Sequence, residues 1–98
     1  NAALPARALR PHAHGFYFAM DNSRKAVRYY ISNMAPKRAL EFVQSFDLPE
    51  DEESCIILCD IRRKSYVQVS NALHVSPESV KRNRRRALSK IVDALTNQ

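Results

Sequence analysis

A dense basic run occupies the last third of the chain. Five of the six residues from 81 to 86 are Lys or Arg, and Ser76, Pro77 and Glu78 precede them. Serine caps free helix amides, proline suits the first helical position, and glutamate favours the positive end of a helix. A helix that starts in this way and carries guanidinium groups in its first turns can bind DNA phosphates and base edges. A basic run alone is usually a solvated face. The interpretation therefore depends on which face of this helix packs on the core and which elements precede it.

A helical wheel separates two faces of the predicted helix. At about 100° per residue, one face is apolar and the other is charged. The apolar face consists of Val80, Ala87, Ile91, Ala94 and Leu95, and the opposite face of Glu78, Arg82, Arg85, Arg86 and Ser89, with Lys81 at its margin. The charge is concentrated in the N-terminal half, which is the half that enters the major groove in helix-turn-helix proteins.

Arg84 is the exception in the basic run, because it projects near the apolar face of the wheel. A buried guanidinium needs a partner. The acidic helix that begins near Glu50 is the obvious source. We therefore predict an ion pair from Arg84 to a carboxylate of that helix. The candidates are Glu52, Glu53 and Asp60.

A short helix is predicted just before the turn. Ser65 and Gln68 fit a capping box, in which each side chain binds the free amide of the other residue. Val69, Ala72 and Leu73 are expected to face inward. His74 and Val75 form the turn, and histidine is among the residues that tolerate positive φ. Two short capped helices joined by about three residues form a helix-turn-helix.

Three further helices are predicted upstream. The first is capped by Asp21 or Asn22, the second opens with Pro36, and the third follows Pro49 with four carboxylates, at positions 50–53, in its first turn. The inner faces are expected to carry Val27, Tyr30, Ile31 and Met34 in the first helix, and Ala39, Leu40, Val43 and Phe46 in the second. These helices are expected to supply core.

Cys55 and Cys59 lie four residues apart, on one face of the third helix. A structural zinc site needs four ligands, and no second cysteine pair or nearby histidine pair in the folded part completes one. His12 and His14 lie in the predicted N-terminal arm. We expect two reduced core thiols, no metal site and no cofactor.

The charge is unevenly distributed. Residues 1–46 carry +5, residues 47–60 carry −6 and residues 61–98 carry +7, which together give the net charge of +6. The basic C-terminal third suits a phosphate backbone.

Composition excludes other classes of protein. Glycine occurs once, so glycine-rich phosphate loops are excluded, and no apolar run approaches the ~20 residues that cross a bilayer. The chain lacks a nucleophile or acid–base constellation, so we expect a soluble, cytoplasmic protein that is not an enzyme.

The 98 residues allow one modest core. The predicted fold is all-α, a bundle of about four to five helices with a C-terminal helix-turn-helix. Residues 1–15 are expected to form a flexible arm, whose Arg7 and Arg10 could reach a minor groove. Residues 16–46 form helices that pack on the core, and residues 47–98 form the DNA-binding domain.

From Leu48 to about Ile91 the sequence resembles region four of bacterial sigma factors. The resemblance rests on Leu48-Pro49, the acidic turn, the apolar stretch to Leu58, Ser65-Tyr66, Val69, Leu73, Val75-Ser76, Val80-Lys81 and Arg86-Ala87-Leu88. LuxR-type regulators and resolvase C-terminal domains share part of this pattern, but the Leu-Pro start and Ala87-Leu88 favour the sigma-like family. Three positions depart from the family: Pro77 stands where arginine is frequent, and His74 and Arg63 stand where glycine is common.

The resemblance implies that the helix from Ser76 binds the minus thirty-five promoter element and that the domain contacts the flap of RNA polymerase. Glu78 and Arg82 match base-reading positions, and the other implied contacts are to phosphate. The full set of expected DNA-binding residues is Arg62, Arg63, Lys64, Ser65, Tyr66, Ser76, Pro77, Glu78, Ser79, Lys81, Arg82, Arg85, Arg86 and Ser89.

The sequence leaves several alternatives open. The length excludes a second domain that melts the downstream element, so we expect either a stand-alone regulator, encoded by a phage or mobile element, or the excised C-terminal domain of a longer factor. A module that binds RNA polymerase or an anti-sigma factor without reading DNA is the competing function. Helix-turn-helix proteins often pair, so the helices before Leu48 could form a homodimer face or cover the core.

Overall fold

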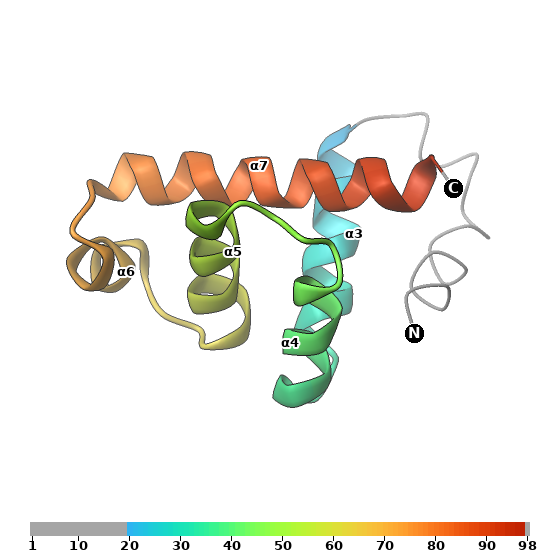
Figure 1. Cartoon of the computed structure of the whole chain (residues 1–98), viewed down its shortest axis with the longest axis horizontal. Helices are drawn as coiled ribbons and strands as arrows, with labels where there is room; N and C mark the ends of the chain where they lie inside the picture. The colour runs from blue at the N-terminus through green and yellow to red at the C-terminus, as the bar shows by residue number, and fades with distance from the viewer. Residues whose placement is uncertain (1–19, 98) are drawn as a thin grey trace.

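The computed structural model describes residues 20–97, which are almost entirely helical (Figure 1). Its elements are α3 (Met20–Ser32), α4 (Pro36–Gln44), α5 (Glu50–Ile56), the π-helix η2 (Ile57–Ile61), α6 (Tyr66–Leu73) and α7 (Pro77–Thr96). This part of the chain contains no strand, and the predicted all-α class is confirmed. No helix within it is long and apolar enough to span a membrane. The arm predicted over residues 1–15 lies outside the described residues.

α7 is the longest helix and forms the axis of the fold. Figure 1 shows α6 beside its N-terminal end, α5 beneath its first half, and α3 and α4 near its second half. The contacts of α7 with α5, α3 and α6 are the most extensive between helices. The two halves of α7 therefore have different neighbours. Its first half packs within the helix-turn-helix, and its second half packs on the helices that precede it.

The buried core has two parts. The larger part joins α3, α4, α5 and the second half of α7, and consists of Val27, Ile31, Ala39, Phe42, Val43, Ile56, Ala87, Leu88, Ile91, Val92 and Leu95. The smaller part lies under the first half of α7 and consists of Cys55, Val69 and Val80, with Leu58, Cys59, Tyr66 and Leu73 packed against it. The helices before Leu48 thus line the larger core rather than standing apart from the helix-turn-helix.

Most predicted core positions are confirmed, but α6 was placed in the wrong rotation. Ala72 is exposed, although the sequence pattern put it inside, and Ser70 is buried in its place. The Ser70 hydroxyl donates to the Val67 carbonyl at 2.8 Å, so this polar group is buried with its hydrogen bond made. Similarly, Phe42 of α4 is buried, whereas Leu40, predicted to face inward, is only partly buried.

The apolar face of α7 is broader than the wheel predicted. Leu88 and Val92 are buried in addition to the predicted Val80, Ala87, Ile91 and Leu95, whereas Ala94 is half-buried. Both α3 and α5 contact α7. A helix covered from two sides buries a wider stripe than a single-sided wheel anticipates.

A π-helix extends α5, and the sequence pattern did not predict it. η2 carries the chain from Ile57 to Ile61, and the Arg62 amide donates to the Ile57 carbonyl at 3.0 Å, five residues back. A π turn fits more residues into each turn than an α-helix, so it redirects the side chains that follow. Asp60 lies in this turn, so the π geometry sets the direction of its carboxylate.

The helix-turn-helix has the caps predicted for it. The Gln68 amide donates to Ser65 Oγ at 3.1 Å, and the Ser65 amide donates to Gln68 Oε1 at 2.9 Å, which completes the capping box. Ser76 Oγ accepts from the Ser79 amide at 3.1 Å, and Pro77 opens α7. These bonds satisfy amides that have no partner within the helix. The starts of both helices are therefore fixed by local sequence.

Left-handed backbone flanks α6 at both ends. Arg63 precedes the helix with φ 61°, and His74 ends it with φ 59°. This is the region that glycine enters without steric cost. The conformation explains why the resemblance expects glycine at both positions. The expectation that His74 tolerates positive φ is confirmed.

The positive φ of His74 makes the turn sensitive to the shape of the side chain. His74→Val should lower the free energy of unfolding by about 1–2 kcal/mol, because a β-branched side chain clashes in the left-handed region. His74→Gly serves as the control and should lose little, since glycine reaches this region freely. Urea unfolding followed by circular dichroism measures both variants. Equal stability of the two would mean that the turn does not require positive φ.

Candidate nucleic-acid interface

Arg84 joins three elements of the helix-turn-helix. Its Nε donates to Asp60 Oδ2 at 2.7 Å and its Nη2 to Asp60 Oδ1 at 2.6 Å, a two-pronged ion pair between α7 and η2. Its Nη1 donates to the Tyr66 hydroxyl at 2.8 Å, at the first residue of α6. The predicted ion pair is confirmed, with Asp60 as the partner. The guanidinium therefore fixes α7 against α6 and η2.

The surroundings of Arg84 favour its charged form. The side chains of Arg84 and Asp60 are only 15% and 9% exposed. The hydrogen bonds that Arg84 donates to Asp60 raise the pKa of Arg84 above its ordinary value, against the opposing effect of burial. All three nitrogens of this guanidinium donate hydrogen bonds within the protein, so few of its N–H donors remain for a nucleic acid. Arg84 is a structural residue, as the wheel indicated.

The other two carboxylates proposed for Arg84 do not contact it. Glu52 of α5 is buried, and Lys90 Nζ lies 3.0 Å from both of its carboxylate oxygens and donates to Oε2. This second ion pair also joins α5 to α7, about two turns beyond Arg84. The two pairs hold α7 at a fixed rotation on the helices beneath it, because each engages a different turn of the helix.

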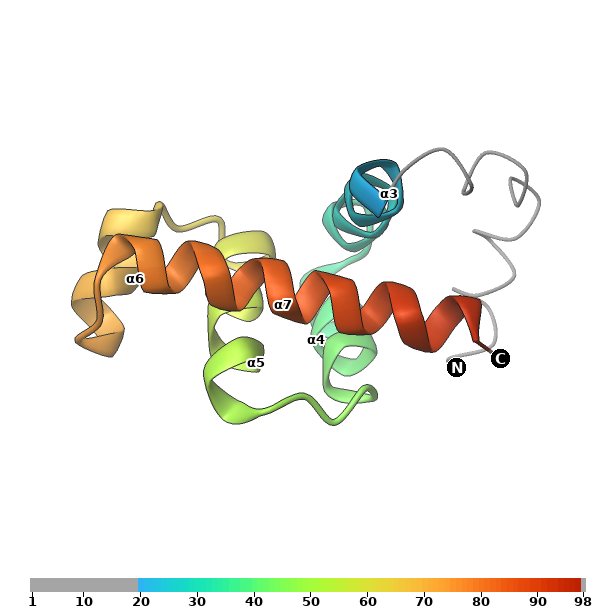
Figure 2. The ribbon, with the colours of Figure 1, turned by 90° about the horizontal axis from the view of Figure 1, so that it is seen from above.

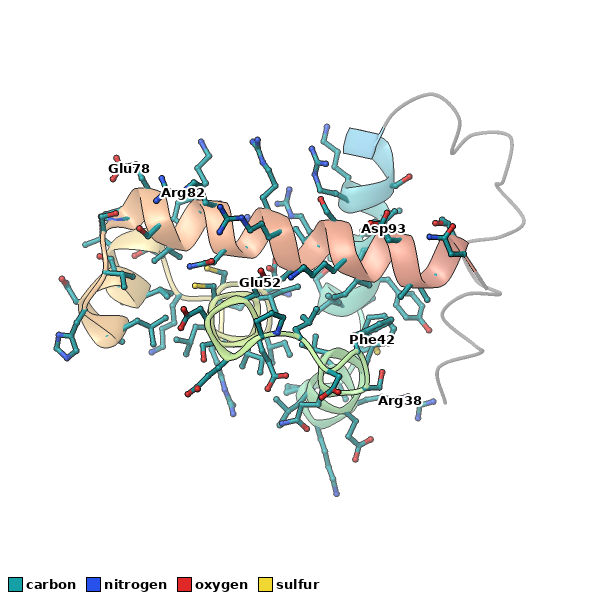
Figure 3. The ribbon with its side chains drawn as sticks, turned by 45° about the horizontal axis from the view of Figure 1, so that its top comes forward. Arg38, Phe42, Glu52, Glu78, Arg82 and Asp93 are labelled. Carbon is teal, nitrogen blue, oxygen red and sulfur yellow. The ribbon has the colours of Figure 1, made fainter. Side chains whose placement is uncertain are left out.

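That rotation exposes four of the predicted DNA-binding residues of α7, two of them predicted to read bases and two to contact phosphate. Glu78, Lys81, Arg82 and Arg85 are solvent-exposed and surround one shallow hollow of about 270 Å³ on the outer face of α7. Figure 3 shows Glu78 and Arg82 together at the N-terminal end of α7, whereas Glu52 lies beneath the helix. The structure thus brings together one carboxylate and three cations, groups that can accept from or donate to base edges and phosphates.

A chain of hydroxyl groups orients Arg82. The Ser76 hydroxyl donates to Ser79 Oγ at 3.0 Å, and Arg82 Nη2 donates to the same Ser79 oxygen at 3.1 Å. This contact holds the guanidinium over the first turn of α7. Because the contact is exposed and involves one of the five guanidinium N–H donors, the remaining donors of Arg82 stay available to a ligand.

The remaining predicted DNA-binding residues divide by exposure. Those on the surface are Arg62, Arg63, Lys64, Ser65, Ser76, Pro77 and Arg86, whereas Tyr66, Ser79 and Ser89 are half-buried. Tyr66 packs against the smaller core, and its hydroxyl accepts from Arg84. The phenol retains its own hydrogen for donation. The residues before α6 and those on the outer face of α7 form the two parts of the candidate interface.

A larger groove, of about 520 Å³, lies between α3, η2 and α7. Lys25, Arg28, Tyr29 and Ser32 line it from α3, Arg63 lines it from the loop before α6, and the pair of Asp60 and Arg84 also borders it. We predicted no DNA-binding role for the α3 residues from the sequence, because that helix was expected to cover the core or to form a homodimer face. Their spacing of three and four residues is a signal for a common helix face and was available in the sequence.

The two cysteines are free thiols. Cys55 is buried and Cys59 is half-buried, and both belong to the smaller core. Burial raises the pKa of both thiols, that of Cys59 to about 11. The described residues contain no group of three or more His, Cys, Asp or Glu side chains that could hold a metal ion. The thiols thus act as small apolar groups.

Because the thiol pKa is raised, the stability of the fold should decrease in the alkaline pH range. The free energy of unfolding should fall as the pH rises from about 9 towards about 11, because the unfolded Cys59 thiol ionises first while the folded thiol keeps its proton. Below pH 9 both states are protonated, so this contribution is constant. Urea unfolding at pH 8, 9 and 10 measures the effect, with Cys59→Ala as the control. An identical pH dependence in the two proteins would contradict the assignment.

One family model matches a segment of the chain. Residues 47–91 match the family model described as Sigma-70, region 4. The matched segment is a little under half of the chain and contains α5, η2, α6 and most of α7. Neither the curated proteins nor the solved structures provide a match to this chain. The match therefore covers the helix-turn-helix and leaves α3 and α4 outside it.

Proposed function

Since residues 47–91 are a sigma-70 region 4-like helix-turn-helix domain, we propose that the chain is a sequence-specific DNA-binding transcription regulator that places α7 in the major groove of promoter DNA. The domains of this family are non-enzymatic and bind DNA. The observation that carries the proposal is the hollow formed by Glu78, Lys81, Arg82 and Arg85 on the exposed first turns of a helix whose rotation is fixed.

Two of these side chains are proposed to read bases. The Glu78 carboxylate can accept a hydrogen bond from cytosine N4, and Arg82 can donate two to guanine O6 and N7. Both are exposed and adjacent on α7 (Figure 3). Pro77 has no backbone N–H or polar side chain to offer, so base reading begins at position 78.

The phosphate contacts are proposed to flank these positions. Lys81, Arg85 and Arg86 are exposed on α7, and the segment from Arg62 to Tyr66 leads into the N-terminal turn of α6. The positive end of a helix dipole favours an anion at that turn. Phosphate contacts at both helices would fix the position of α7 on the duplex without reading sequence.

The family also supports a more specific proposal. Sigma-70 region 4 acts with RNA polymerase in general, so we propose that the DNA is the upstream, minus thirty-five promoter element and that the domain contacts the polymerase flap. Glu50 and Asp51 in the acidic first turn of α5 are exposed, so they remain open to a protein partner.

Substitutions on α7 distinguish base reading from phosphate binding. Arg82→Ala should cost about 1–3 kcal/mol on the preferred site and relax specificity at one base pair, because it removes a two-pronged contact. Arg86→Ala should weaken binding to every sequence alike and lower the salt slope by about one, as expected for one phosphate contact. Fluorescence anisotropy on matched and mutated duplexes measures both. An equal loss on all sequences from Arg82→Ala would remove its base-reading role.

Selection of bound sites from random duplex DNA tests the proposed function directly. We expect one enriched half-site and a linear fall of log K with log salt. A palindromic site would instead indicate a homodimer. Absence of any enriched sequence, together with polymerase capture that salt does not weaken, would contradict the proposal and support a protein-interaction module.

A further inference from the structure

The groove beside α3 is a surface that the helix-turn-helix alone does not explain. Its α3 side is formed by residues outside the segment that matches the sigma-70 family. Lys25 and Arg28 are exposed there, and Tyr29 is 73% exposed. Across the groove, Arg63 Nη2 donates to the Ser32 carbonyl at 3.4 Å, which connects the two walls. The groove therefore has cationic side chains on both sides.

The groove is electrostatically positive. Lys25, Arg28 and Arg63 are exposed cations, and the acidic group that borders the groove, Asp60, already forms a two-pronged pair with Arg84. That pair has no net charge, so the three remaining cations determine the sign. Low-dielectric walls concentrate the field of such charges within a groove. An anion with several charges in a row is the ligand that this arrangement favours.

The groove is continuous with the proposed phosphate-binding segment. Arg63 is both a wall of the groove and part of the segment that leads into α6. Figure 2 shows α3 and the first turn of α6 on one side of α7, with α4 and the first turn of α5 on the other. A duplex backbone that passes the start of α6 can therefore continue towards α3 without crossing α7.

We propose that α3 extends the DNA-binding surface, with Lys25 and Arg28 holding the phosphodiester backbone of the same duplex beyond the bases that α7 reads. This inference rests on the proposed DNA binding. A phosphodiester backbone suits the groove better than an acidic peptide. Its phosphates are regularly spaced, so successive phosphates can pair with Arg63, Arg28 and Lys25. The contact is independent of sequence and adds affinity and footprint length.

Paired substitutions on α3 and α4 test this inference. The variant Lys25→Ala/Arg28→Ala removes two exposed charges from the groove, and Lys37→Ala/Arg38→Ala removes two exposed charges from α4. Figure 3 shows Arg38 far from Glu78 and Arg82. Both pairs are exposed helix positions replaced by the best helix former, so both variants should fold. Circular dichroism and thermal unfolding check this.

Binding is measured by anisotropy, from low to moderate salt, on the selected site within a long duplex and on the same site without flanking base pairs. On the long duplex, the α3 variant should lower the salt slope by about two, since each phosphate that is no longer neutralised accounts for about 0.9. The α4 variant should leave the slope unchanged. On the short duplex, the α3 variant should bind like the wild type. Hydroxyl-radical cleavage should show the protected backbone shortened on one flank only.

The outcomes separate the two proposals. Specific DNA binding by both variants with equal salt slopes and equal footprints would overturn the role of α3 and leave the proposed function intact. No specific DNA binding by the wild type would overturn the proposed function itself. A loss of polymerase capture by the α3 variant, with its DNA slope unchanged, would assign the groove to an acidic protein surface and also overturn this inference.

Discussion

Arg84→Ala is expected to lower the free energy of unfolding by about 3 kcal/mol, at the lower end of the range for a broken buried ion pair. The reason is the Asp60 carboxylate, which is 9% exposed and would lose the partner of both its oxygens. The Tyr66 hydroxyl would lose its bond to the same side chain. Urea unfolding measures the loss, and DNA affinity should fall with it because α7 would lose its fixed rotation.

A double-mutant cycle isolates the cause of this loss. Arg84→Met/Asp60→Leu leaves no unpaired charge, so it should cost less than the sum of the two single changes. Arg84→Lys should not restore stability, since an ammonium group cannot donate to both Asp60 oxygens and to Tyr66 in the same fork. Tyr66→Phe should cost only about 1 kcal/mol. Additive losses in the cycle would mean that the ion pair does not connect the three elements.

Ile31→Ala is expected to cost about 2–5 kcal/mol, the range for removing a large buried aliphatic side chain. Ile31 lies on α3, is 1% exposed, and belongs to the larger core together with Ile91 and Leu95 of α7. The matched control is Val67→Ala, because Val67 is 60% exposed and its loss should stay within about 0.5 kcal/mol. Chemical unfolding followed by circular dichroism compares the two.

The same variant tests whether α3 and the helix-turn-helix unfold together. Cys55 is 1% exposed in the smaller core, so alkylation of its thiol reports the opening of the helix-turn-helix. In a Cys59→Ala background, we expect Cys55 to become reactive at the denaturant concentration at which helicity is lost. Protection of Cys55 beyond that point in Ile31→Ala would show that α3 is a separate unit with no influence on the DNA-binding part.

The proposed extension of the interface depends on this coupling. Because α3 and α7 share one core, the groove between them has a fixed shape, and Lys25 and Arg28 stand at a fixed place relative to Glu78 and Arg82. A surface built on a rigid element positions its charges without the entropic cost of ordering them on binding. The helices before the sigma-like segment would then serve both stability and DNA affinity.

Local sequence was sufficient to predict most of the helix-turn-helix. The capping box of Ser65 and Gln68 and the cap at Ser76 depend on residues within one turn of each other, so their signals are complete in a short window. The same holds for the left-handed His74 and for the burial of Val80, which follow from turn chemistry and helical period. Even the burial of Arg84 followed from the wheel.

Contacts between distant segments could not be predicted in the same way. Three carboxylates were equally plausible partners for Arg84, and the unpredicted π turn of η2 presents Asp60, 24 residues away. Glu52, an equally suitable carboxylate, instead pairs with Lys90, 38 residues away. The wrong rotation of α6, which buries Ser70 instead of Ala72, has the same origin, because the packing of neighbouring helices decides which stripe is covered.

The basic run from 81 to 86 shows which features follow from the sequence and which follow from the tertiary structure. The sequence alone determined that it lies on a capped helix with one apolar face, because helical period and capping act over a few residues. Only the tertiary structure decided how that helix is rotated, which carboxylate neutralises Arg84, and that the cations of α3 lie across a groove from Arg63. Those arrangements depend on how α3, α5 and η2 pack against α7, and no short stretch of sequence contains that information.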